Sequence, residues 1–344
     1  MLLAAGAFVL AFVSKLWSAR FAAPRWNLAD VACVALLVSF SAMRFEVGTD
    51  YLAYQVAYDR LDPAQDWWAQ AQMYQQDLGY TLLALATRAM TDSPHAIFWV
   101  TSAIAIVPVY ATLRKQSKDL PFAVLLYLLL CFYVAPFNII RQGMAFGLVF
   151  WGYSFIKRSK TAFIVIALIA ASLHSTAIIV AAIMFLGRLW KPRLWSTVVL
   201  FAGMGAVAGA IWTVPPVRAL LESLNERYLE YIDSAQESGI TVYIMMALFL
   251  LLAILIATSR ENERPDWLAM ILIGIALLIV STQSPVALRA FNYFGLFVLL
   301  ALPNSLLAHK HGTILRSGVL VGTAVYFAVY VNTFADLVPY QSYQ

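Results

Sequence analysis

Charged residues are scarce in this sequence, and cysteine is nearly absent. Asp, Glu, Lys and Arg make up 12% of the 344 residues, about half the share that is usual in soluble domains. With 62% hydrophobic residues, the chain is neither a disordered protein nor, as a whole, a nucleic-acid-binding domain. The two cysteines, Cys33 and Cys131, both lie inside apolar runs. This placement argues against a disulfide scaffold and against a metal site.

The sequence contains many long runs of apolar residues. One membrane-spanning helix needs about 20 mostly apolar residues, so the sequence predicts an all-α, polytopic integral membrane protein with a single membrane domain over residues 1–344. The first run, Met1–Trp17, has no basic residue ahead of it, whereas a signal peptide carries its positive charges first. We therefore expect a retained first helix whose amino end lies outside. The other predicted spans are Leu28–Met43, His95–Leu113, Leu120–Phe137, Gly143–Ile156, Thr161–Leu173, Ser175–Gly187, Trp195–Val214, Ile240–Thr258, Trp267–Ser281, Ala290–Ala308 and Gly318–Phe334.

The distribution of basic residues predicts the orientation of these twelve helices. If both ends of the sequence lie outside, sixteen of the 23 Lys and Arg residues fall in inner segments, as the positive-inside rule requires. Leu78–Met90 is also apolar, but it is too short to cross, and counting it as a span would invert every later basic cluster. We expect it to lie in the interface, within the outer loop Arg44–Pro94. A second outer loop, Pro215–Gly239, has the spacing of an amphipathic helix.

The first polar group lies at the outer end of the second span. Gly48 and Thr49 are typical of a turn and a helix cap, and Tyr51, Tyr54 and Tyr58 recur at helical spacing on the helix that follows. One interpretation is an interfacial helix with a tyrosine belt, in which Arg44 pairs with Asp50 or Glu46. The other makes Asp50 a base or a sugar ligand and the tyrosines platforms for sugars.

A second group, Asn138, Arg141 and Gln142, forms the short connection between two predicted spans. An arginine at this depth is costly unless it snorkels, is paired or faces a polar cavity, and the neighbouring amides favour a polar pocket. Two further groups are His174 between spans and Arg289 with Tyr293. Their structural alternatives are a hydrogen-bonded packing histidine and a snorkelling arginine.

These groups share the outer side at membrane depth. Arginines bind phosphate oxygens bidentately, so Arg44, Arg141 and Arg289 suit a diphosphate at the end of a lipid. Such donors would stabilise the charge on a leaving diphosphate, and Asp50 or His174 would take the proton of an attacking hydroxyl. The inner loops lack the glycines of a nucleotide-binding loop, which argues against nucleotide hydrolysis.

Several of these motifs resemble the EpsG family of polysaccharide polymerases, relatives of the Wzy-type O-antigen and exopolysaccharide polymerases. The resemblance begins with Arg44 and Val-Gly-Thr-Asp50-Tyr51-x-x-Tyr54, and the match of Phe137-Asn138-Ile-Ile-Arg141-Gln142-Gly-Met-Ala is close. His174 stands where the family carries a histidine. The later landmarks are looser: Arg227-Tyr228-x-x-Tyr231, Arg289-x-x-x-Tyr293-Phe294 and Leu302-Pro303.

The resemblance implies a protein of the bacterial inner membrane, similar to the GT-C glycosyltransferases. It would move undecaprenyl-diphosphate-linked sugar repeats at the outer face, without a nucleotide sugar, metal or other cofactor. Asp50 or His174 would be the catalytic base. The residues that would bind substrate are Arg44, Tyr51, Tyr54, Asn138, Arg141, Gln142, Arg227, Tyr231, Arg289 and Tyr293. A chain-length regulator and a flippase are candidate partners. Alternative functions are a ligase that moves a finished glycan to another acceptor, a flippase or other transporter, and a structural subunit of an export complex.

Overall fold

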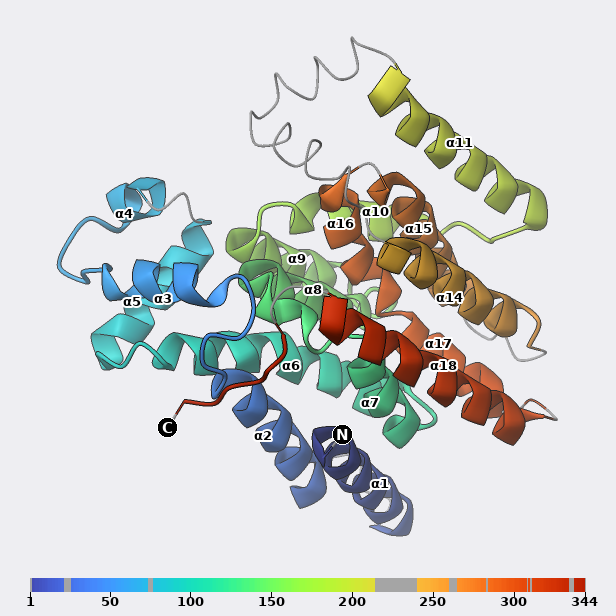
Figure 1. Ribbon diagram of the computed structural model, residues 1–344, viewed down its shortest axis with the longest axis horizontal. Helices are drawn as coiled ribbons and strands as arrows, with labels where there is room; N and C mark the ends of the chain where they lie inside the picture. Colours follow the sequence, from blue (N-terminus) through green and yellow to red (C-terminus); the bar gives the residue numbers. More distant parts are fainter. Residues whose placement is uncertain are drawn as a thin grey trace. The chain divides into compact units, whose positions relative to one another are not determined.

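The computed structural model describes residues 2–21, 26–73, 77–213, 240–259, 265–282, 284–307, 309, 311–333 and 337–343. These residues form helices joined by short connections (Figure 1). Their extended pairing is limited to one isolated antiparallel bridge, between Arg44 and Ser342. The all-α prediction is therefore confirmed for the described part of the chain.

The chain divides into two compact units, and each is described by itself. The first comprises Met1–Ala182 and Thr323–Gln344, and the second comprises Ile183–Gly322. The helices that begin in the first unit are α1 (Leu2–Phe21), α2 (Leu28–Ala42), α3 (Tyr51–Asp59), α4 (Trp67–Met73), α5 (Leu78–Met90), α6 (Ala96–Gln116), α7 (Leu120–Leu129), η1 (Ala135–Phe137), α8 (Ile140–Tyr153), α9 (Lys160–Leu173) and α10 (Ala177–Gly187).

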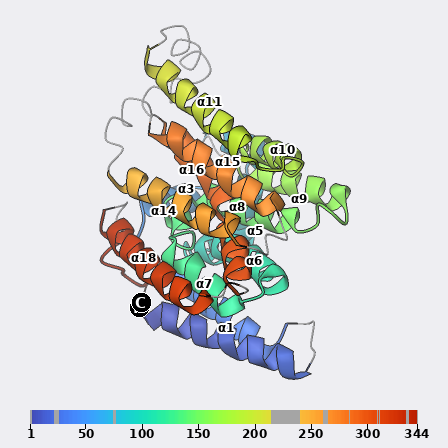
Figure 2. The ribbon, with the colours of Figure 1, turned by 90° about the vertical axis from the view of Figure 1, so that its right-hand side faces the viewer.

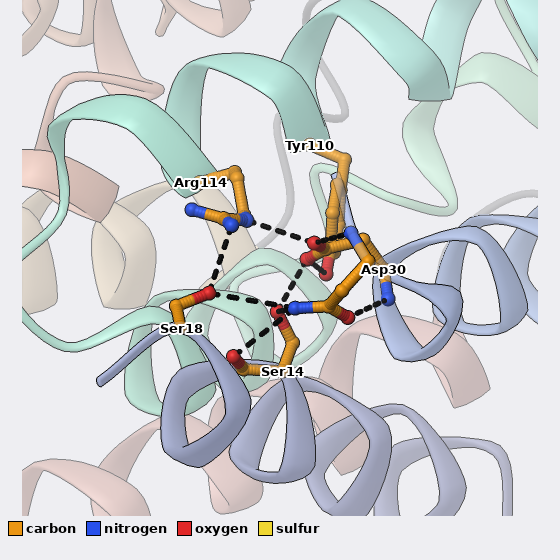
Figure 3. Close-up of polar contacts among 6 residues, drawn as sticks. Ser14, Ser18, Asp30, Tyr110 and Arg114 are labelled. Atoms are coloured by element: carbon orange, nitrogen blue, oxygen red, sulfur yellow. Dashed lines mark hydrogen bonds and ion pairs between the residues drawn. The ribbon is translucent and has the colours of Figure 1, made fainter. Parts of the chain in front are cut away.

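Helix α2 packs antiparallel to both α1 and α6. Near its start, the fully buried Asp30 accepts hydrogen bonds from Ser14 of α1 at 2.5 Å and from Tyr110 of α6 at 2.9 Å, and it pairs with Arg114 at 2.9 Å. Figure 3 shows these side chains converging on Asp30 from the two neighbouring helices. Because a buried carboxylate is costly unless paired and hydrogen-bonded, this set of partners ties the three helices together at one end of α2.

The other end of α2 is bound to α6 by a smaller contact, a 2.8 Å hydrogen bond between Ser41 and Ser102. This end of α2 leads into Arg44, and we call it the Arg44 end of the first unit. Here α3 and α5 pack on the beginnings of α6 and α8 and on the end of α9. The shared core is Tyr51, Tyr58, Leu61, Tyr80, Ala84, Leu85, Ile97, Phe98, Ala105, Ile140, Met144 and Leu173. Helix α5 begins and ends where the sequence pattern predicts, and it caps the bundle at this end.

The second unit is built around α15 (Pro265–Ser281). Helices α11 (Leu194–Thr213), α14 (Ile240–Ala257) and α16 (Pro285–Gly295) contact α15, and α17 (Val298–Leu307) follows α16 directly. Figure 2 shows α14, α15 and α16 next to one another. The close approach of α15 and α16 depends on Gly274, since a Cβ there would lie 3.0 Å from the Cβ of Phe294. The last helix, α18 (Gly312–Thr333), begins in this unit and ends in the first.

Among the described residues, four helical stretches are long and apolar enough to cross a membrane: Leu2–Arg20, Ala96–Gln116, Val286–Leu307 and Gly312–Thr333. Most other predicted spans are shorter apolar helices. The predicted span Leu120–Phe137 differs: α7 ends at Leu129, and a turn with Cys131 at a φ of 65° leads into η1. This turn brings Pro136, Phe137 and Asn138 to the start of α8. The amphipathic helix predicted over Pro215–Gly239 lies outside the described residues.

Candidate functional site

Two sequence motifs more than eighty residues apart meet at the Arg44 end of the first unit. The backbone N–H of Thr49 donates to Oδ1 of Asn138 at 2.9 Å, and the N–H of Ile140 donates to Oδ2 of Asp50 at 3.1 Å. Gly48 permits this approach, because its φ is 91° and an added Cβ would lie 2.8 Å from the carbonyl carbon of Phe137. The turn expected at Gly48 and the short helix after it are both present.

Asp50 supplies a contact that α8 lacks in its own sequence. The residue before α8 is Ile139, whose side chain cannot accept a hydrogen bond, and Asp50 accepts from the first N–H of the helix instead. A carboxylate at a helix N-terminus is favoured by the unpaired N–H groups and by the helix dipole. The Asp50 carboxylate therefore holds the turn of α8 that carries Arg141.

Arg141 lies in the first turn of α8 and reaches back to residues of the 44–94 segment. Its Nε donates to the hydroxyl of Tyr54 at 2.7 Å, and its Nη1 donates to Oδ2 of Asp77 at 2.8 Å. Tyr54 in turn packs edge-on against Tyr80 of α5. Burial raises the pKa of Tyr54 to about 12, so this phenol stays protonated near neutral pH. The Arg141 side chain remains 26% exposed.

Asp77 is the residue of this site that the sequence motifs miss. Its Oδ1 accepts from the N–H of Ser175 at 3.0 Å, and its Oδ2 lies 3.7 Å from Nδ1 of His174. Burial by itself would raise the pKa of Asp77, but the His174 imidazole, the Arg141 guanidinium and the Ser175 N–H together hold it below the ordinary value. Asp77 thus joins Arg141 and His174, two residues that the sequence singles out separately.

A sequence signal for Asp77 exists in retrospect. It directly precedes the apolar segment 78–90, where an aspartate normally caps its own helix. Here the carboxylate makes no such capping bond and turns to Arg141 and Ser175 instead. Gly79, two residues later, allows the contact, since a Cβ there would lie 2.7 Å from the carbonyl oxygen of Ser172.

Arg44 is 2% exposed, and its contacts are with residues other than the cluster of Tyr54, Asp77, Arg141 and His174. Its Nη1 donates to the carbonyl oxygen of Ser41 at 2.6 Å, and its guanidinium faces the rings of Phe98 and Phe137 at 5.0 and 4.6 Å. Burial lowers the pKa of Arg44 to about 10, which leaves it charged near neutral pH. Its contacts tie the end of α2 to the segment that precedes Asn138.

The other candidate residues have different surroundings. Tyr51 is fully buried and stacks on Phe98 with ring centroids 4.5 Å apart, and Gln142 is also buried. In the second unit, α16 carries the partly buried Arg289 and the buried Tyr293 one turn apart. The candidates Arg227 and Tyr231 lie outside the described residues.

Comparison with known proteins identifies the family. The model of the EpsG family matches residues 28–342, nearly the whole sequence. The chain belongs to the EpsG family. Comparisons with curated proteins and with solved structures found no match. Membership of the EpsG family, together with the apolar helices, indicates a membrane protein with a glycosyltransferase-like, polysaccharide-polymerase role.

Proposed function

We propose that this EpsG-family chain polymerises a bacterial surface polysaccharide, such as an O-antigen, exopolysaccharide or capsule. It transfers the growing glycan from undecaprenyl diphosphate to a hydroxyl of an incoming lipid-linked repeat. The reaction takes place at the outer face of the inner membrane, in a twelve-span, GT-C-like domain with both ends of the sequence outside. The leaving group is the lipid diphosphate, so the transfer draws on no nucleotide sugar.

One observation carries this proposal: Arg141 and His174, which lie 33 positions apart in the sequence, contact the same carboxylate of Asp77. An arginine that binds phosphate oxygens thereby lies beside a group that can accept a proton. A glycosyl transfer from a diphosphate needs both groups together. One stabilises the charge on the leaving oxygen, and the other takes the proton from the attacking hydroxyl.

The residues take the following roles. Arg141 binds the diphosphate through Nη2, since its described contacts use Nε and Nη1. Asp50 and His174 are the two candidates for the base. Asn138 and Arg44 hold the two motifs against each other, and Tyr54 orients the guanidinium. In the second unit, Arg289 and Tyr293 remain candidates for further substrate contacts on the sequence grounds given above.

The test uses cells from which the gene has been deleted. Single lipid-linked repeats should accumulate in them, and the native chain should restore long glycans. Arg141→Ala should leave single repeats unpolymerised, and Arg141→Lys should restore only a small fraction of the polymer, because an ammonium lacks the planar fork that contacts Tyr54, Asp77 and the diphosphate together. The measurement is the length distribution of extracted glycans on a gel.

A matched control comes from the same outer segment. Arg88 pairs at 3.8 Å with Asp92, whose side chain is 97% exposed, so Arg88→Ala should polymerise normally. Long glycans at the native level with Arg141→Ala would overturn the role of this arginine. If the native chain attaches finished glycans to another acceptor without lengthening them, the protein is a ligase.

A further inference from the structure

The carboxylate of Asp77 is shared by three separate segments of the chain. It is held by α8 through Arg141 at 2.8 Å and by the turn between α9 and α10 through the N–H of Ser175 at 3.0 Å and His174 at 3.7 Å. Only 16% of its side chain is exposed. An aspartate at the N-cap of a helix normally accepts hydrogen bonds from the first N–H groups of that helix. Asp77 makes no such bond, so its contacts are directed between segments.

We propose that Asp77 is a positioning residue that makes His174, rather than Asp50, the base for the acceptor hydroxyl. The inference rests on the polymerase function proposed above. Nδ1 is the buried ring nitrogen and faces Asp77. A carboxylate on this side keeps the proton on Nδ1, which leaves the lone pair of Nε2 for the acceptor. The distance of 3.7 Å exceeds a direct hydrogen bond, and catalytic contacts of this kind shorten when substrate binds.

Asp50 is committed to a different contact. Its Oδ2 accepts from the N–H of Ile140 at 3.1 Å, so protonating this carboxylate would remove the negative charge that strengthens this bond at the start of α8. His174 can accept a proton without breaking a bond that holds the site. Its positive charge would then be stabilised by Asp77 in the arrangement already present.

The reaction balances with these groups alone. The acceptor oxygen forms a bond to the anomeric carbon of the growing glycan, and its proton moves to Nε2 of His174. The bond from that carbon to the diphosphate oxygen breaks, and the electron pair stays with the undecaprenyl diphosphate, whose charge Arg141 stabilises. Asp77 keeps the imidazole and the guanidinium side by side and remains ionised throughout.

The charged and titratable groups around His174 are few enough to test. Asp77 faces it directly, Arg141 shares that carboxylate, and Tyr54 and Tyr80 lie behind Arg141. Burial raises the pKa of Tyr54 to about 12 and of Tyr80 well above its ordinary value. Among the described residues, Asp77 and Arg141 are therefore the groups whose charges act on the imidazole near neutral pH, and Asp77 lies directly against it.

The experiment compares Asp77→Asn with Asp92→Asn, an exposed aspartate in the same outer segment. Purified protein is supplied with lipid-linked repeats extracted from the deletion cells, and polymer is measured from pH 5 to 9. Asp77→Asn should lower kcat at least about tenfold, since general base catalysis typically contributes about 10² to 10⁴. Asp77→Glu, which keeps the carboxylate, should restore part of the lost rate. Asp92→Asn should leave kcat unchanged.

A second measurement does not depend on activity. With the imidazole nitrogens labelled with ¹⁵N, the chemical shifts of His174 report which ring nitrogen carries the proton at pH 8. The native protein should carry the proton on Nδ1, and Asp77→Asn should move at least part of the population to Nε2. An unchanged tautomer together with an unchanged kcat would overturn the role of Asp77 while leaving the polymerase proposal intact. If the native protein makes no polymer at any pH, the proposed function fails, and the tautomer still decides whether Asp77 controls His174.

Discussion

Ser342 lies beside Arg44 in an antiparallel bridge that joins the segment after α2 to the 337–343 segment. The N–H of Phe45 donates to the carbonyl oxygen of Gln341 at 2.9 Å, and the N–H of Tyr343 donates to that of Met43 at 2.8 Å. Figure 1 shows the 337–343 segment running beside the end of α2. The segment that leads into Gly48 and Asp50 is therefore held by residues from the other end of the sequence.

Tyr340 anchors this bridge and provides the first prediction. Its hydroxyl donates to the carbonyl oxygen of Phe40 at 2.6 Å, and its ring stacks on Phe40 with centroids 4.2 Å apart. Tyr340→Phe should weaken docking of the 337–343 segment by about 1 kcal/mol, and Tyr340→Ala should weaken it further because the stack is also lost. Hydrogen exchange at the amides of Phe45 and Tyr343 measures the effect. Native exchange rates in the alanine variant would show that the segment is held elsewhere.

His95 should make the same docking sensitive to pH. It is 6% exposed and lies 3.5 Å, centroid to centroid, from the ring of Tyr343, with Phe45, Tyr51 and Phe98 around it. Burial lowers the pKa of His95 below its ordinary value of 6.5, so the undocked state binds more protons. Docking is therefore strongest above about pH 7, weakens as the pH falls below 6.5, and levels off below the lowered pKa of the docked state.

The measurement is exchange of the Tyr343 amide at pH 7.5 and 5.5, corrected for the intrinsic rate. His95→Phe keeps a ring in place and should abolish the difference. Tyr51 faces His95 but does not interfere in this range, because burial raises its pKa to about 12. An equal pH response in the phenylalanine variant would assign the effect to another group.

Gly48→Ala should separate the two motifs of the site. A residue with a Cβ at a φ of 91° is strained by about 1 to 2 kcal/mol, and the added atom would meet the backbone of Phe137. We expect a lower melting temperature in detergent and a loss of long glycans. The control is Gly203→Ala in α11, where nothing lies within 4 Å of the added Cβ; that variant should be neutral or slightly stabilised.

Arg114→Leu should destabilise the first unit without touching the candidate site. It would leave the buried carboxylate of Asp30 without its cation, a change that typically costs about 3 to 5 kcal/mol. Lys15→Ala is the comparison, because Lys15 is 42% exposed in its pair with Asp119 and such pairs contribute about 0 to 1 kcal/mol. Thermal unfolding in detergent distinguishes the two. Equal melting temperatures would mean that the hydroxyls around Asp30 suffice to stabilise it.

Much of the helical framework follows from local sequence. Helix α5 begins and ends at the predicted residues, and α9 and α11 each begin one residue before their predicted ranges. The predicted span over Leu120–Phe137 fails after Leu129 because composition alone does not reveal a positive φ at Cys131. A run of apolar residues shows that a segment avoids water. A single backbone turn inside that run depends on the residues that pack against it in the folded protein.

The motif residues were also predicted individually, but their partners were not. Periodicity places Tyr51 and Tyr54 on one helix face, yet Tyr51 stacks in the core whereas Tyr54 binds Arg141. One interpretation of the sequence paired Arg44 with Asp50 or Glu46. In the structure its guanidinium lies against two aromatic rings instead. Hydrogen-bond partners of this kind are separated by dozens of residues, so no local pattern encodes them.

The sequence by itself determined the helical class and the family, and it named most of the candidate site residues, because composition, periodicity and short motifs are local properties. The tertiary structure alone decided that Asp77 joins Arg141 to His174 and that Asp50 holds the start of α8. Those contacts depend on how α5, α8 and α9 pack, and on glycines that let their backbones approach. A carboxylate acquires its role from the charges that folding brings within a few ångströms of it.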